Sequence, residues 1–145
     1  MDGAIWVLNG PNLNRLGKRE PEIYGRTTLA EVKAMCRAEA GDLPLEFRQT
    51  NSESQLIDWI HEAIDAGAAG VAINPAAFTF YSMAVMDALK MLPCPLIELH
   101  ISNVHKREKI YHQSLVSPVA TAVMAGLGAR GYPLAVRALI EMAGD

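Results

Sequence analysis

The sequence predicts an α/β protein with a flavodoxin-like fold, a three-layer sandwich in which helices cover both faces of a five-stranded parallel sheet. Short apolar runs alternate along the chain with longer segments of helical spacing, which is the pattern of βαβ units. Right-handed crossovers between such strands give a parallel sheet. By analogy with other short doubly wound domains, the strand order is 2-1-3-4-5. A chain of 145 residues is a common size for one domain, so residues 1–145 are expected to form a single domain.

The first elements follow from local patterns in the N-terminal third. Ala4–Leu8 is a continuous apolar run, typical of a strand buried on both faces. Thr28–Ala40 places its apolar residues on one face, which predicts a helix, and Gly41 ends it. Leu45–Gln49 is predicted as a second, weaker strand.

The middle of the chain repeats the alternation. Ser52, followed three residues later by Gln55, predicts a helix that begins with a capping box, and Gly67 ends this helix. Gly70–Ile73 is the third strand, and a helix is expected to follow it through about Leu92.

The last third is predicted to hold two strands and two helices. Pro95–Leu99 is the fourth strand, and a short fifth strand is expected around Ser114–Val116. Ser117-Pro118 supplies an N-cap and a proline at the first helical position, so helices are predicted over Ser117–Gly126 and Tyr132–Met142.

No cofactor is expected, because no cofactor motif stands in a fitting context. Gly126–Gly131 matches G-x-G-x-x-G, but it follows a predicted helix rather than a strand and is expected to be an interhelix turn. The sequence has no G-x-x-x-x-G-K-[ST] motif. His100, His105 and His112 are irregularly spaced and lack a carboxylate or cysteine at ligand spacing, so no metal site is expected.

Composition narrows the classes of partner. Thirteen Lys and Arg against sixteen Asp and Glu leave a net charge of -3, which argues against non-specific binding to nucleic acid or to an anionic membrane. Cys36 and Cys94 lack C-x-x-C spacing, and the N-terminus lacks the features of a signal peptide. A soluble cytoplasmic protein with reduced cysteines is therefore expected.

The unusual polar residues follow the first, third and fourth predicted strands. In a doubly wound sheet, ligands bind beyond the carboxyl ends of the strands. The loop after the first strand, residues 9–26, is about eighteen residues long against a usual 2–6, and four cations lie on it. These cations are Arg15, Lys18, Arg19 and Arg26. The sequence therefore predicts a binding site for a small anion at this edge of the sheet.

An acid and a base are available there. Glu98 and His100 are two residues apart at a strand end, so their side chains leave the same face. A carboxylate in that position holds the imidazole in one tautomer and supports its protonated form. Tyr24 can act as a base only as a phenolate, a form that nearby positive charge such as that of Arg19 favours. Residue types and spacing thus indicate acid–base chemistry on a small molecule.

At these residues the sequence resembles the type II 3-dehydroquinate dehydratases. The resemblance covers nearly the whole chain in order, and its first and fourth-strand motifs are highly specific. The segments that carry it are Leu8–Asn14, Leu16-Gly17, Arg19–Pro21, Ile23–Gly25, Arg48-Gln49, Asp58–Ile60, Ile73–Ala77, Asp87–Leu89, Ile97–His105, Gly126–Gly128 and Gly131-Tyr132. It implies removal of water from 3-dehydroquinate to give 3-dehydroshikimate through an enolate, in the shikimate or quinate pathway, without a metal or organic cofactor.

The resemblance also implies catalytic roles. Tyr24 is the base that takes a proton from the carbon beside the ketone. Arg19 favours the tyrosinate and the developing enolate, and Asn12 helps to place the reacting groups. His100, held by Glu98, is the acid that protonates the departing hydroxyl.

A second set of roles concerns binding and assembly. The resemblance implies that Asn74 and the backbone N–H groups of Ile101 and Ser102 hold the substrate carboxylate. It also implies that Asp87 reaches a neighbouring subunit's site in a dodecamer built from trimers.

The chain departs from the family at three positions, and two of them, those of Phe80 and Tyr111, read the substrate in the family. Phe80 replaces a histidine that helps to read the ring hydroxyls, and Tyr111 and Met86 replace arginines. Three hypotheses therefore stay open: a 3-dehydroquinate dehydratase, a dehydratase for a less hydroxylated cyclic keto acid, and an idle paralogue that binds an acid.

Overall fold

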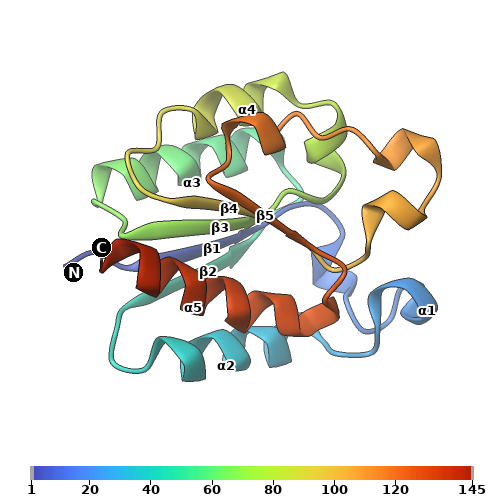
Figure 1. Cartoon of the computed structure of the whole chain (residues 1–145), viewed down its shortest axis with the longest axis horizontal. Coiled ribbons are helices and arrows are strands. Elements are labelled where there is room, and N and C mark those ends of the chain that lie inside the picture. The colour runs from blue at the N-terminus through green and yellow to red at the C-terminus, as the bar shows by residue number, and fades with distance from the viewer. Residues whose placement is uncertain (1, 145) are drawn as a thin grey trace.

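The computed structural model describes residues 2–144 and contains one five-stranded sheet (Figure 1). Its strands pair in the order β2-β1-β3-β4-β5, and every pair is parallel. The strands are β1 (Ile5–Asn9), β2 (Leu45–Gln49), β3 (Gly70–Asn74), β4 (Leu96–His100) and β5 (Ala122–Ala125). The predicted fold class and strand order are confirmed, and the first four strands lie within one residue of their predicted bounds.

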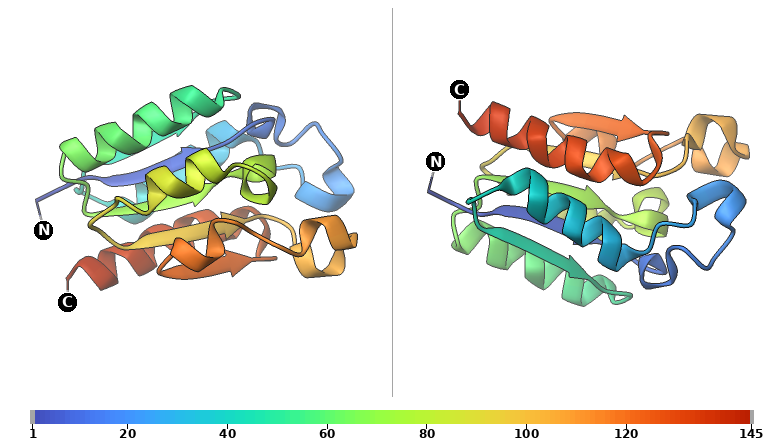
Figure 2. Two further views of the ribbon diagram at one scale, coloured as in Figure 1. Left: turned by 90° about the horizontal axis from the view of Figure 1, so that it is seen from above. Right: turned by 90° about the horizontal axis from the view of Figure 1, so that it is seen from below.

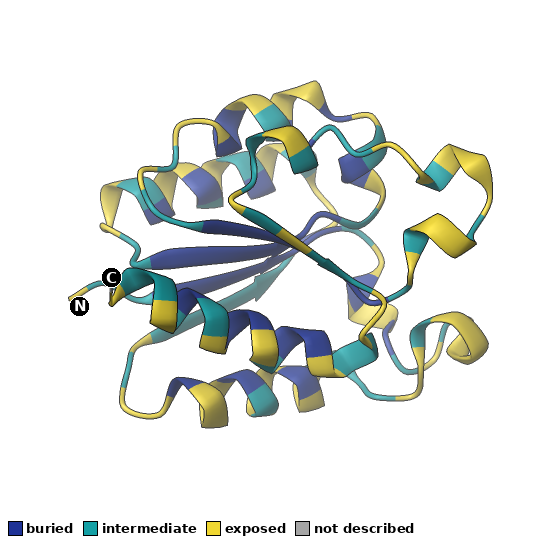
Figure 3. Cartoon of the chain, in the orientation of Figure 1, coloured by how far each residue is buried: buried dark blue, intermediate teal, exposed yellow. Residues whose placement is uncertain are grey.

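Helices cover both faces of the sheet (Figure 2). Helices α2 (Leu29–Ala40) and α5 (Gly131–Ala143) pack on one face, and α3 (Glu53–Asp65) and α4 (Met83–Leu89) pack on the other. Strands β1, β3 and β4 are buried at every position, as Figure 3 shows. The side chains of β1 alternate between the two faces, so Ile5 and Val7 join the core under α2 and α5 while Trp6 and Leu8 join the other.

Side chains cap the beginnings of α2 and α3, and only the capping box at Ser52 was predicted. At Thr28 the full capping box is present, because its side chain accepts from the backbone N–H of Glu31 and the Glu31 side chain accepts from the backbone N–H of Thr28. At Ser52 only half of the predicted box forms. The Ser52 hydroxyl accepts from the backbone N–H of Gln55, but the Gln55 side chain accepts from Thr50 Oγ1 at 2.6 Å instead.

The predicted helix that follows β3 is divided. Residues Ala76–Phe80 form a 3-10 helix, and α4 begins at Met83, capped by the Ser82 side chain. A short α-helix, α1 (Pro21–Tyr24), lies inside the long loop after β1. No helix within residues 2–144 is long and apolar enough to cross a membrane.

The prediction for residues 114–126 is wrong. No strand forms at Ser114–Val116, and the segment predicted as a helix over Ser117–Gly126 holds a 3-10 turn followed by strand β5. Alanines favour a helix locally, but β4 offers an open backbone edge, and β5 pairs along it from Ile97↔Ala122 to His100↔Ala125. Sheet pairing outweighs the small differences in intrinsic helix propensity.

The glycine-rich segment Gly126–Gly131 therefore connects a strand to a helix, and the prediction of an interhelix turn is also wrong. Its glycines allow close packing. A Cβ on Gly126, whose φ is 89°, would lie 3.1 Å from Asn103 Cβ, and the Gly128 N–H donates to the Ile101 carbonyl at 3.1 Å. The segment thus supports the loop that follows β4.

Candidate active site

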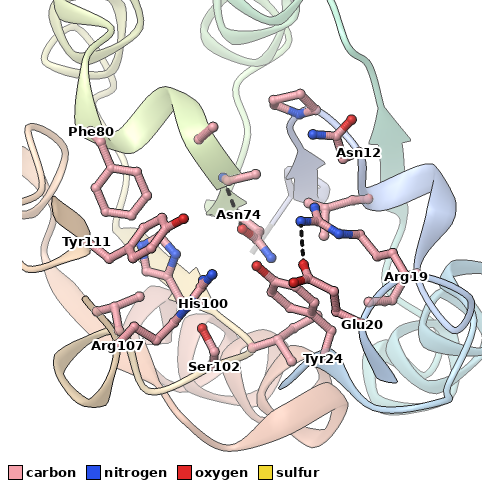
Figure 4. Close-up of a pocket in the computed structure, with 17 residues that line it drawn as sticks. Asn12, Arg19, Glu20, Tyr24, Asn74, Phe80, His100, Ser102, Arg107 and Tyr111 are labelled. Carbon is pink, nitrogen blue, oxygen red and sulfur yellow. Dashed lines mark hydrogen bonds and ion pairs between the residues drawn. The ribbon is translucent and has the colours of Figure 1, made fainter. Parts of the chain in front are cut away.

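A cavity of about 200 Å³ opens where the loops after β1, β3 and β4 meet (Figure 4). This is the edge at which doubly wound sheets bind ligands. The predicted site residues that line it are Asn12, Arg19, Tyr24, Asn74, Phe80, His100, Ile101, Ser102 and Tyr111. Glu98 lies behind His100 on β4, and Asp87 is exposed on α4, outside this cavity.

His100 is the last residue of β4 and is nearly buried at the base of the cavity. Its Nε2 lies 2.5 Å from Oε2 of Glu98, which is 1% exposed. Burial raises the pKa of Glu98, but hydrogen bonds from His100, Ser117 and Ser114 and the charge of His100 together hold this pKa below its usual value. The predicted pair of carboxylate and imidazole therefore forms, and the carboxylate is ionised.

Tyr24 lies across the cavity from His100, at the end of α1 (Figure 4). The guanidinium of Arg19 stands over its ring, with Cζ 4.6 Å from the ring centroid, and also pairs with Glu20 at 3.1 Å. The loop therefore presents a phenol with a positive neighbour, as predicted.

Arg107 was not among the predicted site residues. Its Cζ stands 4.0 Å from the ring centroid of Tyr111 and 5.5 Å from that of Tyr24. Tyr24 is therefore flanked by a second guanidinium besides that of Arg19. One signal was available in the sequence, the unusual polarity of the loop after β4. That signal did not distinguish Arg107 from the other charged residues beside it.

Asn74 is held by two hydrogen bonds at the end of β3. Its Oδ1 accepts from the Ala76 N–H at 3.1 Å, and its Nδ2 donates to Tyr132 Oη at 2.9 Å. Burial raises the pKa of Tyr132, so the phenol keeps its proton and donates it to Asn9 Oδ1 at 2.7 Å. The amide of Asn74 is thereby fixed, and its second N–H remains for the cavity. Tyr132 and Asn9 are positioning residues that the sequence did not reveal.

Two aromatic side chains form one wall of the cavity. The Phe80 ring lies 6.4 Å from the His100 ring at an angle of 26°, and Tyr111 meets Phe80 edge-on at 5.3 Å. On the opposite side, Asn12 lines the cavity with its backbone in the left-handed region, where its N–H donates to Asn51 Oδ1 at 2.9 Å.

The arrangement of a buried imidazole, a flanked phenol and an amide in one cavity is that expected from the resemblance noted in the sequence. A family model for class II dehydroquinases matches residues 3–140. The chain belongs to this family.

Relatives of known name agree with the family model. The 3-dehydroquinate dehydratase of Methylobacterium radiotolerans is 54% identical over 144 residues, which cover 98% of this chain and 96% of that protein. A protein of Agrobacterium fabrum named 3-dehydroquinate dehydratase 2 is 56% identical over 138 residues, with coverage of 94% and 93%.

Two crystal structures share the fold. The type II dehydroquinase of Butyrivibrio crossotus superposes with a TM-score of 0.92 at 40% identity and covers 95% of this chain and 97% of its own. That of Propionibacterium acnes gives a TM-score of 0.88 at 48% identity, with coverage of 100% and 99%. The family and fold predicted from the sequence are confirmed.

Proposed function

We propose that this chain is a 3-dehydroquinate dehydratase, a hydro-lyase that converts 3-dehydroquinate into 3-dehydroshikimate in the shikimate or quinate pathway. Its relatives bear that name over nearly its whole length. The observation that carries the proposal is one cavity with Tyr24 on one side and His100, held by Glu98, on the other. Elimination of water needs a base and an acid placed in this way.

The first step removes a proton. The phenolate of Tyr24 takes a proton from the carbon beside the ketone, and the C–H electron pair moves into an enolate. Arg19 and Arg107, whose guanidinium groups flank the tyrosine ring, stabilise the phenolate before transfer. Arg19 also favours the developing enolate, and Asn12 helps to place the reacting groups.

The second step expels water. The enolate re-forms the ketone as the carbon–oxygen bond to the leaving hydroxyl breaks, and His100 gives that hydroxyl a proton. Glu98 stabilises the imidazolium before transfer and holds the ring in place. The two steps use only side chains of the protein, so the proposal includes no cofactor.

The substrate carboxylate is bound at the base of the cavity. The free N–H of Asn74 and the backbone N–H groups of Ile101 and Ser102 are the proposed donors, and all three residues line the cavity. A small-molecule carboxylate is the only partner in this proposal besides copies of the same chain.

We propose that the subunits form trimers that assemble into a dodecamer in the cytoplasm. Several large apolar side chains are exposed on the described subunit, which supports burial against other copies. They include Tyr81, Met83, Val123, Leu127 and Leu134. Asp87, exposed on α4, is proposed to reach a neighbouring subunit's site.

The decisive experiment is a continuous assay of 3-dehydroquinate dehydration by the appearance of enone absorbance. Tyr24→Phe removes one hydroxyl and is expected to lower kcat by about 10²–10⁴-fold, the usual contribution of a general base. Ser54→Ala, an exposed change on α3, is the control. No turnover by the unmodified enzyme would refute the proposal, and near-normal kcat in Tyr24→Phe would refute the role of Tyr24.

A second candidate function is dehydration of a less hydroxylated cyclic keto acid. The observation that favours it is the aromatic wall of Phe80 and Tyr111, which presents ring faces where a hydroxylated substrate needs hydrogen-bond partners. A comparison of kcat/KM for the two kinds of ring acid separates the candidates.

A further inference from the structure

We propose that Thr79, Ser114 and Ser117 are positioning residues for the proton donor: their hydroxyls fix Glu98 as a pure acceptor, and this makes Nδ1 of His100 the atom that transfers the proton. The kinetic part of this inference rests on the proposed dehydratase activity. The structural part, which nitrogen of His100 carries hydrogen, does not depend on it.

The three hydroxyls surround a carboxylate that is almost completely buried. Thr79 Oγ1 lies 3.0 Å and Ser114 Oγ 2.8 Å from Glu98 Oε2, and Ser117 Oγ contacts Oε1. Thr79 belongs to the 3-10 helix after β3, and the two serines lie in and beside the 3-10 turn that precedes β5. Three hydroxyls from two separate segments therefore converge on one side chain of β4.

The hydrogens of this cluster can be assigned by counting. Ser114 Oγ accepts from the backbone N–H groups of Val116 at 3.0 Å and Ser117 at 3.1 Å, so both of its lone pairs are in use. Thr79 Oγ1 lies 2.8 Å from Ser114 Oγ and cannot donate to it. Whichever way Ser114 turns its own hydrogen, the hydrogen of Thr79 goes to Glu98.

Both oxygens of Glu98 thus receive hydroxyl hydrogens, Oε2 from Thr79 and Oε1 from Ser117. A proton on either oxygen would displace one of these donors inside the protein, where an unmet donor is costly. The lowered pKa of Glu98 agrees with this count. Among the titratable groups of residues 2–144, only His100 is hydrogen-bonded to the carboxylate. Tyr111, His105 and His112 line a second cavity, which Glu98 and His100 also line.

An ionised carboxylate can only accept. Nε2 of His100, 2.5 Å from Glu98 Oε2, must therefore carry its hydrogen in both the neutral and the protonated ring. The proton that comes and goes is then on Nδ1. Because His100 lines the substrate cavity, Nδ1 is the nitrogen left to serve it (Figure 4).

Long-range ¹⁵N NMR of the imidazole nitrogens tests the assignment without any substrate. In the unmodified protein, Nε2 of His100 is expected to stay protonated across the titration while Nδ1 gains and loses its hydrogen. Thr79→Val keeps the shape of the side chain but removes its donor. Because Ser114 can still turn its hydrogen to Oε2, Thr79→Val is combined with Ser117→Ala, and this double variant is expected to populate the other tautomer at neutral pH. Thr79→Ser keeps a hydroxyl and is expected to restore the original tautomer.

Kinetics supply a second readout. Thr79→Val is expected to lower kcat about tenfold with little change in KM, because a hydrogen bond to a charged group is lost from the donor and not from the substrate. As the pH is lowered, the activity of Thr79→Val should begin to fall at a higher pH than the activity of Thr79→Ser. Ser117→Ala, which removes the donor to Oε1 at a half-buried position, repeats the test if Thr79→Val does not fold.

The outcomes are distinct. A neutral His100 with hydrogen on Nδ1 would overturn the inference, as would identical tautomers and pH profiles in Thr79→Ser and in the double variant Thr79→Val with Ser117→Ala. Absence of turnover in the unmodified enzyme, together with the expected NMR result, would overturn the dehydratase proposal and leave the assignment of Nδ1 intact.

Discussion

The two sides of the cavity are built differently. The proton donor stands on a central strand, where Glu98 and His100 are buried and Glu98 is hydrogen-bonded to three hydroxyls from two other segments of the chain. The proposed base, Tyr24, lies in a long loop on a helix of one turn, half-buried, with an exposed ion pair beside it. The donor is therefore fixed by the fold itself, whereas the base is placed by a surface loop.

Because of this difference, a change at the donor is expected to affect both folding stability and catalysis, whereas a change at the base is expected to affect catalysis alone. Residues on rigid strands hold a reacting group in place but tie its chemistry to folding, while loop residues can change with little cost to the core. Backbone strain also lies in the loops, since Asn12 and Glu20 have φ values of 71° and 35°. Four predictions test how far the contrast extends, beginning with the largest expected effect.

Glu98→Leu is expected to lower the free energy of unfolding by about 3–5 kcal/mol, since it leaves buried donors without their acceptor. The hydroxyl of Thr79 and the imidazole of His100 both lose their partner. Tyr24→Phe is expected to change this free energy by no more than about 0.5 kcal/mol. Urea unfolding at matched protein concentration measures both, and equal losses would remove the contrast between the two sides.

The aromatic wall tests substrate choice within the same cavity. Each ring hydroxyl buried without a partner costs about 1–3 kcal/mol, or roughly 5- to 150-fold in affinity. The double variant Phe80→His with Tyr111→Arg returns polar partners and is expected to raise kcat/KM for 3-dehydroquinate by at least about fivefold. The wild-type enzyme is expected to bind a less hydroxylated ring acid comparatively well. High activity of the wild type that the double variant does not improve would show that this wall does not select the substrate.

The sequence predicts the site residues that local spacing reveals, but not those that only the tertiary fold brings together. Glu98, His100 and Tyr24 were found because spacing along one strand or one loop is visible locally. The hydroxyls of Thr79, Ser114 and Ser117 were missed, since they reach Glu98 from 19, 16 and 19 positions away. Contacts of that range depend on the tertiary fold, not on any local pattern.

The fold shows the same limit. Strands β1, β3 and β4 are buried on both faces and are recognisable in the sequence as apolar runs. Their order in the sheet was predicted by analogy. Strand β5 is half exposed, and its local sequence, with two alanines and a valine, predicts a helix. The segment forms a strand because it pairs with the edge of β4. Tyr132 and Arg107 escaped notice for a related reason, because a tyrosine in a helix and an arginine in a charged loop have common structural roles.

The pH dependence of stability should arise on the donor side. The folded pKa of Glu98 is lowered, so its contribution is fully present above the ordinary glutamate value of about 4.3 and is lost as pH falls through the folded value. Wild type and Glu98→Gln, compared by urea unfolding from pH 7 to pH 3, should therefore differ most at neutral pH and converge in acid. A gap that widens as pH falls would contradict the sign.

The smallest expected effect concerns Arg107, the residue that joins the two sides. It comes from the loop after β4 yet stands over the rings of Tyr111 and Tyr24, at 4.0 and 5.5 Å from their centroids. Arg19 is nearer to Tyr24, at 4.6 Å, so its loss should lower activity more than the loss of Arg107.

We expect Arg107→Gln to lower kcat/KM by about fivefold, in line with about 1 kcal/mol for a partly exposed charge. Arg107→Lys keeps the charge but loses the planar contact with Tyr111, so it should recover only part of this loss. Because added salt screens an exposed charge, the gap between wild type and Arg107→Gln should narrow as ionic strength rises. A gap that salt does not change would mean that Arg107 acts by packing against Tyr111. The positive charge that acts on Tyr24 would then come only from the loop after β1, which carries Arg19.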